Sequence, residues 1–98
     1  MTETAQHSRR TAQLLNLLGD AGFTADDQLE FLPDGDGYVE HPDGIWIHAS
    51  PHMVRMVVPS SGDLPHYRLV LSTSDLTSTE AIRIIAMHAR AALQHREV

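Results

Sequence analysis

The 98-residue sequence contains no cysteine and no lysine, and each absence excludes a class of chemistry. Without cysteine the chain forms no disulfide, has no thiolate nucleophile and cannot hold a cysteine-ligated zinc ion. Without lysine its glycine-containing loops cannot be phosphate-binding loops of the Walker type. No apolar run approaches the ~18 residues that span a bilayer. We therefore expect a soluble, cytoplasmic protein without a membrane partner.

Positive charge is also scarce. The sequence contains seven arginines and thirteen acidic residues, so the formal net charge is −6. Domains that bind nucleic acid usually carry a basic surface, and this composition predicts no direct contact with DNA or RNA. A chain of this length makes one domain with a modest core. We expect a single α+β domain over residues 1–98, ordered over about residues 5–95.

The first periodic segment covers residues 4–21. Leu14, Leu17 and Leu18 fall on one side at helical spacing, which predicts an amphipathic helix packed on a core. Gly22 suits the left-handed position that follows a helix. Thr24 is a candidate cap for a short helical turn before the loop that begins at Pro33.

A β-hairpin is the clearest local signal in the middle of the chain. Pro42, Asp43 and Gly44 separate two alternating runs, and all three residue types favour a turn. The same alternation, interrupted by further turn residues, predicts an antiparallel meander of about four strands. These strands are expected at 37–41, 44–49, 53–58 and 66–72.

The last segment predicts the best-defined helix. Thr77 and Glu80 have the spacing of a capping box, and Leu76 and Ala81 have that of a hydrophobic staple. Apolar periodicity then continues to Leu93. The order helix, sheet, helix most simply gives a two-layer α+β sandwich with the N-terminal and C-terminal helices on one face of the sheet.

Seven histidines raise the question of a metal site. In an antiparallel meander His41 and His66 lie near one end of the sheet, whereas His48 and His52 lie near the other. Zinc needs at least three protein ligands, so neither pair suffices alone. We expect no metal and no cofactor, and a histidine-based metal binder stays open as an alternative. No catalytic constellation stands out, because the serines occupy turn and cap contexts.

Side-chain alternation divides the strands into two faces. The expected core face holds Ile45, Ile47, Ala49, Val54, Met56, Val58, Tyr67, Leu69 and Leu71, and the opposite face holds Trp46, His48, Met53, Arg55, Val57, Arg68 and Val70. Two helices on one face leave the opposite face open to a partner, unless Trp46 is covered by Arg55 in a cation–π pair. The last helix carries a second apolar flank with Ile84, Met87 and Ala91.

These leftover surfaces favour a small non-enzymatic protein-interaction module that forms a homodimer and binds a protein partner through the open face or the helix flank. An alternative is an acidic regulator, comparable to some phage-encoded inhibitors, that occupies a basic nucleic-acid-binding site on another protein. The carboxylates available for that role are Asp26, Asp27, Glu30, Asp34 and Asp36.

Overall fold

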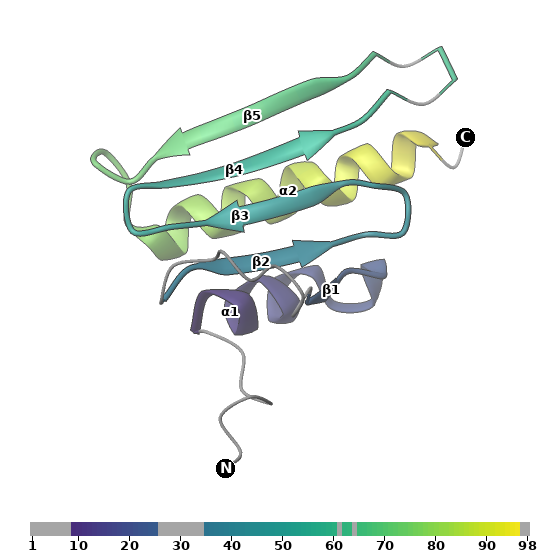
Figure 1. Cartoon of the computed structure of the whole chain (residues 1–98). Coiled ribbons are helices and arrows are strands. Elements are labelled where there is room, and N and C mark those ends of the chain that lie inside the picture. The colour runs from purple at the N-terminus through teal and green to yellow at the C-terminus, as the bar shows by residue number, and fades with distance from the viewer. Residues whose placement is uncertain (1–8, 26–34, 61, 64, 97–98) are drawn as a thin grey trace.

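A five-stranded antiparallel sheet and two helices form the protein, whose structure is a computed structural model (Figure 1). The structure describes residues 9–25, 35–60, 62–63 and 65–96. The strands are β1 (Thr24–Ala25), β2 (Gly37–Glu40), β3 (Trp46–Ala49), β4 (Met53–Val58) and β5 (Tyr67–Ser72), and they lie side by side in chain order. Helix α1 (Arg9–Leu18) and a 3₁₀ turn, η2 (Gly19–Ala21), precede the sheet, and α2 (Ser78–Arg96) follows it.

The α+β class and the antiparallel meander were predicted correctly, but the number of strands was not. Thr24 and Ala25 form a strand paired with Glu40 and Val39, where the sequence suggested a cap for a helical turn. A β-branched threonine fits a strand as well as a cap, and the neighbouring edge of β2 supplies the hydrogen-bonding partner. The rest of that predicted turn, residues 26–33, lies outside the described residues, as do residues 4–8 of the first predicted helix.

Turn and cap residues behave as their chemistry predicts. Gly22 ends η2 with a φ of 95°. In the β2–β3 turn the Gly44 N–H donates to the His41 carbonyl at 2.8 Å, and Gly44 itself has a φ of 95°. This is a type I turn followed by a left-handed glycine, a common three-residue hairpin loop. Thr77 and Glu80 form the reciprocal capping box, each side chain accepting the other residue's N–H at 3.1 Å.

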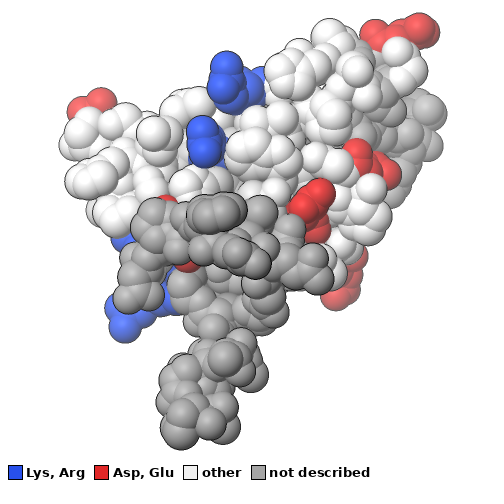
Figure 2. Space-filling model, viewed as in Figure 1, with Lys and Arg blue, Asp and Glu red and all other residues white. Residues whose placement is uncertain are grey.

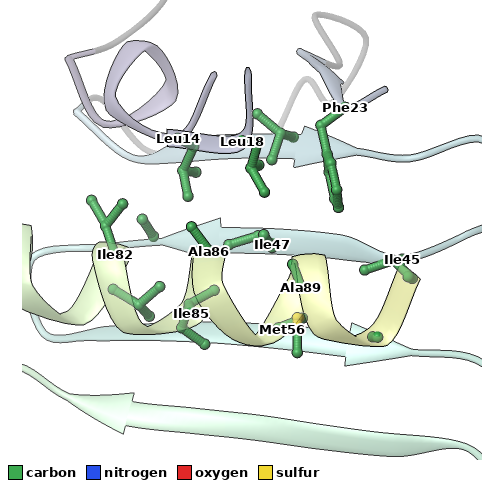
Figure 3. Packing of buried hydrophobic residues seen from close by; sticks show 14 of the residues in the cluster. Leu14, Leu18, Phe23, Ile45, Ile47, Met56, Ile82, Ile85, Ala86 and Ala89 are labelled. Carbon is green, nitrogen blue, oxygen red and sulfur yellow. The ribbon is translucent and has the colours of Figure 1, made fainter. Parts of the chain in front are cut away.

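One core joins both helices to one face of the sheet. Leu14 and Leu18 of α1 point toward Ala86 of α2 and Ile47 of β3 (Figure 3). Six residues predicted for the core face are buried: Ile45, Ile47, Ala49, Val54, Met56 and Val58. Both helices therefore cover the same face, as the shared apolar stripes predicted.

The last strand contributes no fully buried residue to the core, although Leu69 and Leu71 pack against it. Tyr67 is 42% exposed, and Leu69 and Leu71 are half-buried, although all three were expected in the core. In Figure 1, α1 lies beside β2 and α2 crosses behind β3 and β4, which leaves β5 beyond the helices at one side of the sheet. Helix α1 packs mainly on β2 and α2 mainly on β4, so the helix layer is centred away from β5.

Candidate protein-interaction surface

Strand pairing places the expected open-face residues in two adjacent rows across the sheet. One row runs Tyr38, His48, Arg55 and Val70 in order from β2 to β5. The neighbouring row runs Glu40, Trp46, Val57 and Arg68. Six of the seven open-face residues named from the sequence lie in these rows, and Met53, paired with Ser72, lies beyond them on the same face. Tyr38 was missed, although the alternation of β2 could have placed it there.

Trp46 is held by its neighbours in this layer. Its ring stacks on Tyr38 with centroids 5.8 Å apart and an interplanar angle of 25°. The guanidinium carbon of Arg55 lies 5.5 Å from the centroid of the Trp46 ring. This is the internal cation–π pair that the sequence offered as the alternative to a partner contact. All three residues are half-buried, so their side chains are held in place by one another and only partly available to a partner.

Exposure rises along the rows toward β5. Val70 is 51% exposed and Met53, at the start of β4 on the same face, is 40% exposed. Arg68 is exposed and Val57 is half-buried. Figure 2 views this face and shows basic side chains among uncharged ones in its upper half, where β4 and β5 run in Figure 1. The accessible part of the open face therefore combines apolar groups with arginine.

His48 and Asp36 form a polar pair at the other end of the first row. The His48 Nε2 atom lies 2.9 Å from an Asp36 carboxylate oxygen. Asp36 is 7% exposed, so it does not belong to an exposed acidic surface, which corrects its assignment from the sequence. A carboxylate that is buried in this way needs such a partner. Asp26, Asp27, Glu30 and Asp34 lie outside the described residues.

The flank residues of α2 lie on the other side of the sheet. Met87 is 62% exposed, Ala91 is exposed and Ile84 is half-buried. Thr79 and Arg90 bond to α1, and at 100° per residue Ile84 falls on the flank of α2 away from α1. The seven partner-binding residues expected from the sequence thus form two surfaces, one on each side of the sheet.

The histidines of the described residues do not gather around a common point. His41 follows β2 and His66 precedes β5, so three strand spacings, roughly 14 Å, separate the two ends. This excludes the His41 and His66 pair that the sequence left open. Across residues 9–25, 35–60, 62–63 and 65–96, no group of three or more histidine, aspartate or glutamate side chains could hold a metal ion.

A shallow cavity of about 240 Å³ opens between η2, the β2–β3 turn and the end of α2. Its polar groups support the local backbone: the Asp43 N–H donates to His41 Nδ1 at 3.0 Å, and Arg90 donates to the Leu17 carbonyl at 3.4 Å. The residues that line it are Asp20, Ala21, His41, Asp43, Arg90, Leu93 and Gln94. This arrangement brings no nucleophile next to a base.

No described helix combines the length and the apolar character that crossing a membrane requires. Comparison of the chain with protein-family models, with curated proteins and with solved structures found no match.

Proposed function

We propose that this chain is a non-enzymatic protein-interaction module that binds a protein partner through the open sheet face, at the part formed by Met53, Val57, Arg68 and Val70. The observation that carries the proposal is the rise in exposure toward β5. Val70, which is 51% exposed, lies between an exposed arginine and Met53, which is 40% exposed, on a sheet face that no described helix covers. Arginine and methionine are enriched in protein interfaces.

The chemistry of this surface indicates what it binds. Val57 and Val70 offer apolar contact, and Arg68, which pairs with Val57, offers a guanidinium that can bind a carboxylate. The side chains of Trp46 and Arg55 are already held by stacking and cation–π contacts, so they lose little conformational entropy on binding. A partner with an apolar patch next to an acidic side chain fits this surface. The acidic-regulator alternative has less support, because Asp36 is buried.

Two exposed methionines allow a matched test. A photo-crosslinking amino acid at Met53 reports on the open face, and the same residue at Met87 reports on the solvent side of α2. In an extract of the producing cells, we expect the Met53 probe to capture one protein that excess unmodified chain displaces. The Met87 probe should not capture it. Capture of the same proteins by both probes, or no displaceable capture at Met53, would refute the open-face site.

A substitution then tests the chemistry with the captured protein after its purification. Arg68→Glu should weaken its binding by at least about tenfold, or ~1.4 kcal/mol, because the guanidinium is replaced by a like charge facing the partner's carboxylate. Arg83→Glu, an exposed charge reversal on α2, is the matched control and should leave affinity unchanged. Equal losses for both variants would mean that net charge, not the open face, governs binding.

A further inference from the structure

Strand β5 has an unpaired edge of six residues. The order of the sheet gives β5 a hydrogen-bonded neighbour, β4, on one side only among the described strands. The Thr73 N–H donates to the His52 carbonyl at 3.1 Å, next to the Met53 and Ser72 pair. Backbone groups alternate in direction along an antiparallel strand. The N–H and C=O groups of Arg68, Val70 and Ser72 therefore point outward, away from β4.

This edge has few of the features that usually prevent strand pairing. Such protection comes from charged side chains, above all lysine, and from proline, a bulge or a very short strand. β5 contains neither lysine nor proline, pairs with β4 in a continuous register and carries one charged residue, Arg68. The opposite edge of the sheet, β1, is only two residues long. The two edges thus differ, and β5 is the one open to another strand.

Apolar side chains accompany the edge on both sides of the sheet. On the open face Val70 is 51% exposed. On the helix side Leu69 and Leu71 are half-buried, although they pair with the fully buried Met56 and Val54. Ile84 lies on the α2 flank away from α1 and is also half-buried. A further strand beside β5 would bury more of these apolar side chains, which the chain's own helices cover only in part.

We infer that a second copy of this chain pairs with β5, antiparallel about a two-fold axis, to make one continuous sheet. A free antiparallel edge is complementary to itself under two-fold rotation, since each outward N–H meets an outward C=O of its mate. Charge is compatible with a second copy in one register. Pairing centred on Val70 sets Arg68 opposite the partner's neutral Ser72, whereas pairing centred on Arg68 would oppose two like charges.

The register follows from the outward groups. Only registers that keep both helix layers on the same side, with like faces aligned, bury the leucines. Centred on Val70, the pairing gives Arg68, Val70 and Ser72 a partner within β5 itself. On the helix side Leu69 then lies opposite the partner's Leu71. Centred on Leu69, by contrast, the outward groups of Ser72 would pair with His66, which precedes the strand.

Single cysteines test this arrangement cleanly, because the chain has none of its own. Val70→Cys places two thiols on the two-fold axis, where Cα atoms of a hydrogen-bonded pair are ~5.5 Å apart, within disulfide reach. Met87→Cys is the control, since Met87 is the more exposed at 62% but points away from the edge. In air-oxidised micromolar protein, Val70→Cys should form the covalent dimer roughly 100-fold faster than Met87→Cys, because pairing raises the effective thiol concentration to millimolar.

Loss of the pairing is tested by Val70→Pro. This change removes an outward N–H and leaves the bonds to β4 intact, so the fold should persist in far-ultraviolet circular dichroism. Light scattering should then change from twice 10.9 kDa for the unmodified chain to 10.9 kDa for the variant. A mass of 10.9 kDa for the unmodified chain at high concentration, or equal oxidation of the two cysteine variants, would overturn the inference.

The inference does not depend on the proposed open-face partner, and the tests separate the two. Side chains of the open face remain accessible in an extended sheet. Arg68→Glu should therefore lose the partner while keeping the doubled mass, and Val70→Pro should lose the doubled mass. Failure of the cysteine and scattering tests leaves capture at Met53 unaffected, and failure of capture leaves the dimer unaffected.

Discussion

Close contact between α1 and β2 depends on two small residues. The Tyr38 N–H donates to Thr11 Oγ1 at 3.1 Å, at a part of β2 that lies beyond its pairing with β1. Next to this bond, a Cβ atom on Gly37 would lie 2.6 Å from the Thr11 backbone nitrogen. A hydroxyl on the helix thus takes the place of a strand partner, and the absence of a side chain on Gly37 lets the helix come near enough.

The hydroxyl of Thr11 can be tested by a pair of substitutions. Thr11→Ala should lower the free energy of unfolding by about 1 kcal/mol, because it removes the part-buried hydrogen bond from the Tyr38 N–H. Thr11→Ser keeps the hydroxyl and should cost clearly less. Urea unfolding followed by circular dichroism measures both. Equal losses for alanine and serine would show that the methyl group of Thr11, not the hydrogen bond, stabilises the contact.

Gly37 is tested by the smallest possible enlargement. Gly37→Ala brings a methyl group within 2.7 Å of Arg10 backbone and side-chain atoms, so α1 must move away from β2. Overpacking of this kind costs about 1–3 kcal/mol. The unfolding midpoint in urea should fall accordingly. A variant as stable as the unmodified chain would mean that the helix is free to shift.

At the scale of single elements, local chemistry sets where α2 begins. Its first turn is held by the reciprocal bonds of Thr77 and Glu80, and Ala81 behind them is fully buried. The two edge strands of the sheet differ in length and in how open they are to another strand. β1 is too short to attract another strand, whereas β5 runs the full length of β4 with little protection.

The capping box supplies a prediction at this scale. Thr77→Ala removes the acceptor for the Glu80 N–H and should reduce the free energy of unfolding by ~1 kcal/mol. Thr77→Ser retains the oxygen and serves as the control. Both are measured by denaturant unfolding at one protein concentration, so that self-association does not enter the comparison. A serine variant as unstable as the alanine variant would contradict a role for the hydroxyl oxygen.

For the whole molecule, the proposed pairing couples stability to concentration. A second copy that binds the folded chain and not the unfolded one raises the melting temperature as protein concentration increases. We expect this dependence for the unmodified chain and its disappearance in Val70→Pro. Thermal scans over a hundredfold range of concentration measure it. A melting temperature independent of concentration in both proteins would exclude a dimer that forms through β5.

The sequence by itself determined the features whose physics is local. Glycine and proline positions located the β2–β3 turn and the end of η2, a capping box located the start of α2, and alternation assigned Trp46, Arg55 and Val70 to one face. These depend on a residue and its neighbours within about four positions, which a sequence displays directly. Strand β1 was not predicted, because two residues are too few to show an alternating pattern. Its formation depends on pairing with β2, which is distant in the sequence.

Only the tertiary structure decided how much of each face is covered. Alternation placed Tyr67, Leu69 and Leu71 on the core side, yet their exposure depends on where the two helices lie across five strands. Likewise, the sequence placed Asp36 on the surface, but the β2–β3 register brings it next to His48, where it is buried. The burial of a side chain and the pairing of a strand both depend on contacts with residues that are distant in the sequence. The position of the two helices over β2 and β4, which no local pattern encodes, therefore left β5 less covered than the other long strands.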